Sequence, residues 1–126
     1  MTTALSFVES PPGLAPLCDF TLDEVEGAPG LHTMRSSGEP GIRLFVLDAP
    51  VYLPWYEPAF DDENYASIGG RPDTTRVLVV ATISEGAPVV NLMAPVLVNR
   101  ATGAARQVIL GEEWPLAARL SQPGAA

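Results

Sequence analysis

Prolines and glycines interrupt this chain at close intervals, and that spacing limits the possible folds more than any other feature. Thirteen prolines and eleven glycines are dispersed through 126 residues, and the apolar runs between them are short. Proline breaks the interior of a helix and glycine weakens it. We find no segment with a 3.6-residue apolar repeat that is long enough for a major helix. The sequence therefore predicts an all-β protein with at most one or two short helical turns.

Short segments rich in β-branched and aromatic residues are the candidate strands. Their spacing is typical of a barrel or a sandwich, and we expect an antiparallel, β-barrel-like domain. The longest segment is apolar at both odd and even positions, which predicts a strand covered on both faces. The candidate strands are residues 4–9, 18–23, 31–36, 42–48, 76–84, 89–93, 96–99 and 106–110, with a weaker one at 114–120.

Residues 61–68 have the features of one short helix. Three acidic residues stand at its start, where the helix dipole favours negative charge. Gly69 and Gly70 follow and can end the helix, because glycine adopts the left-handed conformation common at helix C-termini.

Length and charge restrict the class of protein. A chain of 126 residues is expected to form one domain, residues 1–126, with residues 1–4 and 121–126 frayed. Fifteen acids against seven arginines give a net charge of −8. Direct binding of nucleic acid is therefore not expected, since phosphate contacts need clustered cations, whereas a basic protein is a suitable partner.

Two further features point to the cytoplasm. No apolar stretch approaches the roughly 20 residues that span a bilayer, and no signal-peptide pattern is present, so no membrane association is expected. Cys18 is the single cysteine, which precludes an intrachain disulfide and fits a reducing compartment. We interpret Cys18 as a small buried apolar residue.

The sequence offers no recognisable catalytic, metal or cofactor site. His32 is the only histidine, and no ligand spacing joins it to Cys18 or to a carboxylate. The segment Gly69-Gly70-Arg71 lacks the lysine and the spacing of a phosphate-binding loop. Adjacent acids at Asp61-Asp62 and at residues 112–113 are interpreted as solvated turn residues. We therefore expect no catalytic residue, no metal and no cofactor.

A proline interrupts the strand-like segment VNLMAPVLVN, residues 90–99. Proline cannot donate to a β-ladder, so Pro95 belongs to an edge, a bulge or a bend. Asn91 and Asn99 would share a face in an unbroken strand, and one extra residue at Ala94-Pro95 would put them on opposite faces. We therefore predict a corner at Pro95, followed by a hairpin loop that ends at Gly103.

The same segment resembles the flagellar assembly factor FliW family. That family has Asn-Leu-x-Ala-Pro, three apolar residues and Asn, followed by Gln-Val-apolar-Leu. Here the run NLMAPVLVN is followed by RQVIL at residues 106–110. Four further motifs of the family have counterparts upstream. Pro-Gly-Phe corresponds to PGL at 12–14, and Leu-Gln-Ser corresponds to MRS at 34–36. A strand ending in proline corresponds to DAP at 48–50, and Tyr-Glu to YE at 56–57. The resemblance covers residues 7–120 and departs from the family at Leu14, at Arg35 and in the short 61–70 connection.

The resemblance implies a monomeric, non-enzymatic β-barrel-like protein that binds flagellin in the cytoplasm and also binds the translational regulator CsrA. In that scheme the bound protein keeps CsrA from repressing flagellin messenger RNA, and free flagellin competes for it. An acidic domain suits CsrA, which must present cations to RNA. Tyr56, like Trp55, is a candidate interface anchor, although core packing is an open alternative for Trp55. The candidate partner-binding residues are Asp48, Pro50, Tyr56, Asp61, Asp62, Glu63, Asn91, Pro95 and Asn99.

A different class of protein stays open on this sequence. In a small ligand-binding or enzymatic barrel, His32 and a carboxylate would act on a molecule held in the barrel mouth. An open polar cavity that contains His32 would favour this alternative. An interior filled by side chains would favour the interaction protein.

Overall fold

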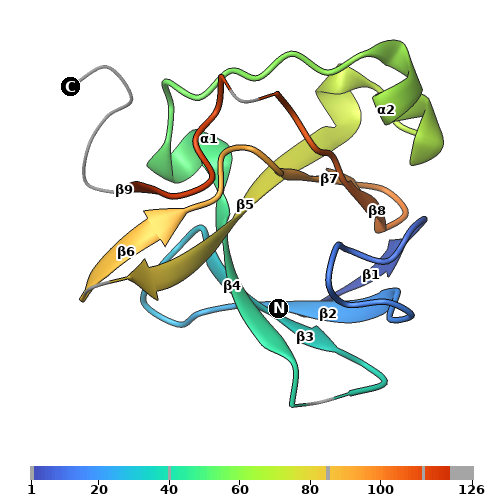
Figure 1. The fold of residues 1–126 in the computed structure, drawn as a ribbon. Helices are drawn as coiled ribbons and strands as arrows, with labels where there is room; N and C mark the ends of the chain where they lie inside the picture. The colour runs from blue at the N-terminus through green and yellow to red at the C-terminus, as the bar shows by residue number, and fades with distance from the viewer. Residues whose placement is uncertain (1, 40, 85, 112, 120–126) are drawn as a thin grey trace.

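Seven strands close into a β-barrel around an apolar interior (Figure 1). The computed structural model describes residues 2–39, 41–84, 86–111 and 113–119. Around the barrel the order is β4 (Arg43–Asp48), β3 (Leu31–Ser36), β2 (Asp19–Glu24), β1 (Thr2–Phe7), β8 (Ala104–Gln107), β7 (Val96–Asn99) and β5 (Thr75–Ser84), which pairs again with β4. Neighbouring strands of the barrel are antiparallel except β1 and β8, which run parallel. The prediction of an all-β, antiparallel barrel is confirmed, with one parallel pair at the seam.

The remaining elements lie outside the barrel. Strand β6 (Ala87–Val90) pairs with the far half of β5, and the two-residue β9 (Ala118–Arg119) pairs with β6. Helix α1 (Ala49–Tyr52) follows β4 directly, and the 3-10 helix η1 (Pro72–Thr74) precedes β5. Helix α2 (Asp62–Ser67) falls inside the segment predicted to be helical. No helix among the described residues is long and apolar enough to cross a membrane.

Side chains of alternate residues fill the barrel interior. Each barrel strand sends every second side chain inward. The long strand β5 sends Leu78 and Val80 inward, while Val77 and Val79 point outward under the residues that follow β4. Residues 77–80 are therefore covered on both faces, as predicted, whereas Thr82 further along the strand is exposed. The buried interior residues are Leu5, Phe7, Phe20, Leu22, Met34, Val46, Leu78, Val96, Val98 and Ala105.

The chain switches faces at Pro95, as predicted, but the excursion is larger than the single extra residue expected. Val90 pairs with Ala81 of β5, and Val96 pairs with Leu78 of the same strand. Residues 91–95 thus stand opposite only residues 79 and 80. Because three residues are extra, Val90 packs on the outside of the barrel and Val96 packs inside it.

The strand predicted at residues 106–110 begins and ends earlier in the structure. The side-chain oxygen of Asn99 accepts hydrogen bonds from the backbone N–H groups of Ala101 and Thr102, which tightens the loop. Strand β8 starts at Ala104, which pairs with Ser6 of β1. Its ladder with β7 ends at Gln107: the N–H of Val108 still donates to the carbonyl of Pro95, but Pro95 has no N–H to donate in return.

Gly103 makes the parallel seam possible. Its carbonyl accepts a 2.9 Å hydrogen bond from the N–H of Ser6, its φ is +81°, and a Cβ there would overlap the carbonyl oxygen of Ala4. Gly27 has a φ of +83° with open space around it. The two positions share the same backbone strain and differ in steric crowding.

We expect Gly103→Ala to destabilise the protein by about 1–3 kcal/mol more than Gly27→Ala, because the added methyl group must push β1 away from β8. Gly27→Ala should cost only about 1–2 kcal/mol for its left-handed backbone. Urea unfolding followed by circular dichroism measures both. Equal losses in the two variants would contradict this account of the seam.

Candidate functional site

A layer of polar side chains closes one end of the barrel interior. His32, Asp48 and Arg76 occupy inward positions of β3, β4 and β5, each two residues from a buried apolar side chain of the same strand. At the opposite end, Leu14, Leu17 and Cys18 pack against the core. The interior is therefore apolar between these ends.

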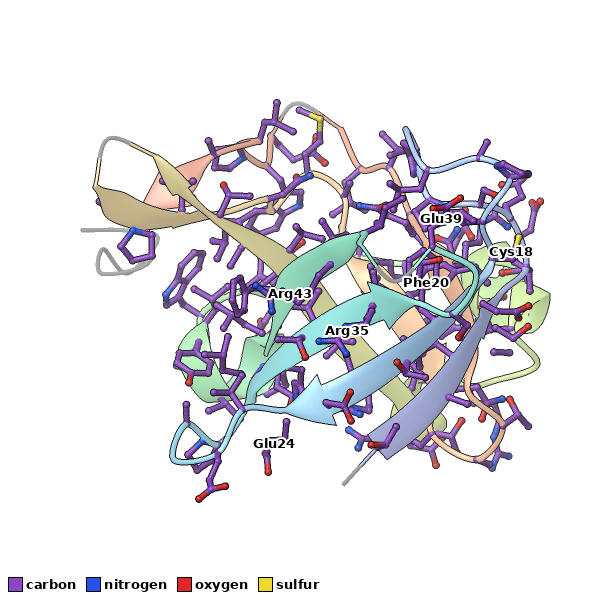
Figure 2. All side chains as sticks on the ribbon, turned by 90° about the horizontal axis from the view of Figure 1, so that it is seen from below. Cys18, Phe20, Glu24, Arg35, Glu39 and Arg43 are labelled. Carbon is purple, nitrogen blue, oxygen red and sulfur yellow. The ribbon has the colours of Figure 1, made fainter. Side chains whose placement is uncertain are left out.

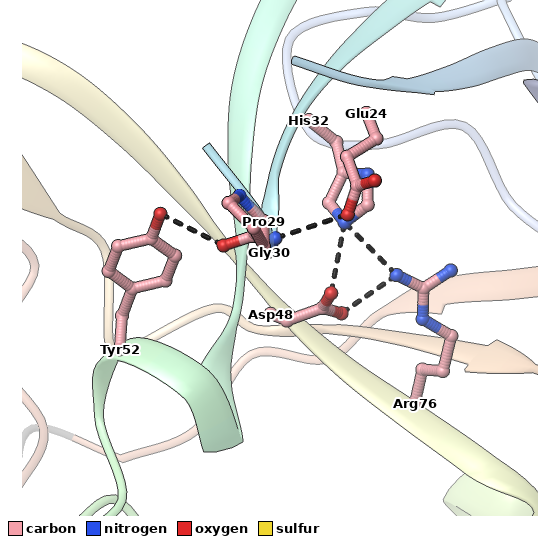
Figure 3. Close-up of polar contacts among 7 residues, drawn as sticks. All are labelled: Glu24, Pro29, Gly30, His32, Asp48, Tyr52 and Arg76. Carbon is pink, nitrogen blue, oxygen red and sulfur yellow. Dashed lines mark hydrogen bonds and ion pairs between the residues drawn. The ribbon is translucent and has the colours of Figure 1, made fainter. Parts of the chain in front are cut away.

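The three polar residues contact one another directly (Figure 3). Asp48 Oδ1 accepts a 2.7 Å hydrogen bond from Arg76 Nη2, and Asp48 Oδ2 lies 2.9 Å from His32 Nε2. Arg76 Nη2 also lies 3.2 Å from His32 Nε2. One ring nitrogen cannot donate and accept at once, and a hydrogen bond to a carboxylate is stronger than one to a neutral imidazole. We therefore assign the Nε2 proton to the bond with Asp48.

The electrostatics of Asp48 follow from these contacts. Burial raises the pKa of its carboxyl by desolvation, but the hydrogen bonds of His32 and Arg76 and the charge of Arg76 outweigh burial and lower the pKa below its ordinary value. Asp48 is therefore a carboxylate at neutral pH, and its charge balances the partly buried guanidinium of Arg76.

A cleft of about 510 Å³ opens beside this cluster. Its lining comes from the first residues of β1 and β5 and from the last residues of β4 and β7, with the residues that follow them. These strand ends meet at the end of the barrel that holds Asp48 and Arg76. Three predicted partner-binding residues, Asp48, Pro50 and Asn99, line it together with Arg76 and Arg100. Its mixed charges suit polar side chains of a partner. Within the described part of the chain, no group of acidic, histidine and cysteine side chains could hold a metal ion.

The other predicted acidic residues, Asp61, Asp62 and Glu63, lie at the start of α2, which contributes nothing to the lining of the cleft. Asp61 is the N-cap of this helix: its Oδ1 accepts a 2.8 Å hydrogen bond from the N–H of Asn64, whose side chain accepts one from the N–H of Asp61. Asp62 and Glu63 are exposed in the first turn. At the start of α2, the carboxylates of Asp62 and Glu63 are therefore available to a partner, whereas that of Asp61 caps the helix.

Tyr56 is a core residue and not an exposed anchor. It is 7% exposed, its hydroxyl donates a 2.6 Å hydrogen bond to the carbonyl of Leu92, and its ring meets Trp114 edge to face at 4.8 Å. Burial raises its pKa well above the ordinary tyrosine value. Trp55, partly buried, packs against the same cluster. The sequence made both residues candidate anchors and left core packing open only for Trp55, because an aromatic pair among prolines has the same pattern whether it is buried or exposed.

Asn91, Pro95 and Asn99 are also tied into the fold. Asn91 Oδ1 accepts hydrogen bonds from the N–H groups of Met93 and Ala94, so it shapes the turn. Pro95 is buried, and the Asn99 side chain donates a 2.9 Å hydrogen bond to the carbonyl of Ile68 at the end of α2. These contacts are structural. A role of these residues in binding stays a prediction.

Arg76 is the site residue that sequence reasoning missed. It shares the parity of the inward-facing Leu78 and Val80. Because both faces of this strand are apolar, a charge on either face would be covered and would need a partner. The sequence does not reveal that this partner is Asp48, because the contact depends on how β4 and β5 pair.

We expect Asp48→Asn to lower the free energy of unfolding by about 1.5–3 kcal/mol at pH 7, because it leaves Arg76 and His32 without their charged acceptor. The folded pKa of Asp48 lies below the unfolded value of about 3.9, so this stabilisation is present above that pH and is lost as the pH falls through the folded pKa. The variant should therefore lose less stability than the parent below about pH 4.

Asp73→Asn is the matched control, since Asp73 is 78% exposed and lies 3.8 Å from the equally exposed Arg71. It should change stability by less than about 1 kcal/mol. Denaturant unfolding at pH 7 and near pH 3 measures all three proteins. If the two substitutions cost the same at pH 7, the cluster does not hold the barrel end together.

Comparison with known proteins adds to this geometry. The family model described as FliW protein matches residues 2–120. The fold is similar to that of a solved protein described as "Crystal structure of the flagellar assembly factor FliW", with a TM-score of 0.85 and 22% sequence identity over 96% of this chain and 87% of that chain. At that identity the likeness shows the fold alone. No match was found among curated proteins.

Proposed function

Because the match over residues 2–120 shows that this chain belongs to the FliW family, we propose that it is a flagellar assembly factor that binds flagellin and the translational regulator CsrA. In this proposal it acts as a cytoplasmic monomer. When bound to CsrA it relieves repression of flagellin messenger RNA, and free flagellin competes for it. The single observation that carries the proposal is the family match over nearly the whole chain.

The charge of the protein supports a basic partner. The chain carries a net charge of −8, and Asp62 and Glu63 stand exposed at the start of α2. A protein that binds RNA presents cations, and complementary charge raises the rate of encounter more than it raises affinity.

The filled barrel supports an interaction protein over the enzymatic alternative. His32 does meet a carboxylate, as that alternative requires, but it is 7% exposed and its Nε2 faces both Asp48 and Arg76. His32 is not among the residues that line the cleft. We therefore interpret the His32 and Asp48 pair as part of the barrel's structure.

Calorimetry with purified flagellin and CsrA from the same organism tests the proposal. We expect each partner to bind with a dissociation constant below about 100 μM, which corresponds to about −5.5 kcal/mol. The same measurement on Asp48→Asn at pH 7 shows by how much the dissociation constant depends on the polar cluster at the barrel end. If neither partner binds the parent protein, the proposed function is wrong.

We expect the double substitution of Asp62 to Asn and Glu63 to Gln to slow association with CsrA several-fold while leaving the off-rate nearly unchanged. Exposed charges act within a Debye length of about 8 Å, so raising the salt concentration should remove the difference. Surface-plasmon kinetics at two salt concentrations measures this effect.

The double substitution of Asp19 to Asn and Glu26 to Gln is the matched control. Both residues are exposed, and the pair removes the same net charge at another place. If both double variants slow association equally, total charge and not the α2 surface steers CsrA. Asp61 is left unchanged because its carboxylate caps α2.

A further inference from the structure

An apolar groove lies on the outer face of the barrel, apart from the cleft. Its volume is about 470 Å³, and its lining includes Leu31, Phe45, Leu47, Tyr52 and Pro88. Helix α1 separates the two hollows, because Pro50 and Val51 line the cleft while Tyr52 lines the groove. The groove is therefore a surface distinct from the cleft.

Phe45 is the exposed aromatic residue of this groove. It points outward because the neighbouring Val46 is buried in the barrel interior. Its side chain is 42% exposed, and among the described residues it is the only aromatic side chain in the exposed class. A large exposed aromatic ring in a hollow is a typical contact point for a partner protein.

Two arginines flank the groove on one side. Arg35 of β3 and Arg43 of β4 stand directly opposite each other in the antiparallel register, and both are exposed (Figure 2). The Arg43 guanidinium lies over the Phe45 ring, 5.7 Å from its centroid. Neither arginine forms an ion pair within the described residues.

This placement is unfavourable for the isolated protein. Like charges directly opposite each other across two strands destabilise a sheet. The chain has fifteen acidic residues and only seven arginines, yet two of the seven face each other, and neither forms an ion pair with a residue that the structure describes. A partner that supplies carboxylates would remove this repulsion on binding.

We propose that the groove binds an acidic segment of a partner polypeptide, which places an apolar side chain against Phe45 and its carboxylates against Arg35 and Arg43. Arginine pairs with carboxylates through two parallel hydrogen bonds, which gives such a contact its orientation. The apolar lining and the net charge of −8 favour a peptide over a nucleic acid at this surface. The partner has the opposite charge from the one that suits α2, and the inference does not depend on flagellin or CsrA binding.

Fluorescence anisotropy with designed peptides tests the groove. The probe is a labelled peptide of about twelve residues that alternates glutamate with leucine and phenylalanine, and its control replaces every glutamate with lysine. We expect the acidic peptide to bind at least about tenfold more tightly than the basic peptide. The substitutions Arg35→Gln and Arg43→Gln together should remove that difference.

Arg71→Gln with Arg106→Gln is the matched control, since removing these arginines changes the net charge equally. Arg71 and Arg106 line neither the cleft nor the groove, and they lie beside Asp73 and Glu9. The control should bind the acidic peptide like the parent. Phe45→Ala should weaken binding of the acidic peptide while leaving the basic peptide unaffected.

Thermal unfolding separates binding from structure. Arg35→Gln should leave the melting temperature of the free protein unchanged or raise it, because it removes the like-charge pair. Five results would overturn the proposal. Three concern peptide binding: no binding of the acidic peptide up to about 1 mM, equal binding of the two peptides, or equal effects of the two double-arginine variants. The other two are a lowered melting temperature for Arg35→Gln and tighter binding of a single-stranded RNA oligonucleotide than of the acidic peptide.

Discussion

Burial of β5 on both faces is the constraint on which the rest of the structure depends. Its inward residues Leu78 and Val80 complete the barrel core, and its outward residues Val77 and Val79 anchor the segments packed outside the barrel. A strand covered on both faces must also satisfy both of its hydrogen-bonding edges, and β5 does so with β4 on one side and with β7 and β6 in turn on the other. Arg76 lies two residues before Leu78 and therefore also points inward, at the end of the barrel. Asp48 balances its charge there.

The excursion at residues 91–95 lets the chain pair with β5 twice, first with its side chains on the outer face and then with its side chains in the barrel core. One neighbour of β5 has to contribute Val90 to the outer cluster and Val96 to the barrel core, which requires a change of face. Asn91 stabilises the turn, and Pro95 ends the pairing of β7 with β8 because it has no N–H to donate. The segment that most resembles the FliW family is therefore the segment that the barrel needs in order to switch faces. Its recognisable pattern is explained by folding before any partner is considered.

The sequence predicts what depends on local chemistry and not what depends on strand pairing. The apolar residues at both odd and even positions of β5, the acids at the start of α2 and the proline at 95 each have a local physical cause. Each of these features agrees with the structure, for β5 over residues 77–80. The parallel seam at Gly103 and the contact between Asp48 and Arg76 arise from the register of distant strands, which parity alone does not fix. The burial of Tyr56 likewise depends on residues far away in the sequence, among them Leu92, whose carbonyl accepts its hydroxyl, and Trp114, whose ring it meets.

Separate surfaces of opposite charge change what competition between two partners would require. No residue at the acidic start of α2 lines the groove beside Arg43. Two partners that contact only these surfaces could therefore bind at the same time. Competition would then need one of two things: a partner large enough to clash with the other partner outside these surfaces, or a coupling free energy between the two binding events. The barrel offers contacts for such coupling: Asn99 holds the end of α2 and lines the cleft, and Asp48 at the same cleft leads into α1, whose Tyr52 lines the groove. Any such coupling is reciprocal, so a partner that loosens the other from its surface is itself loosened by the same factor.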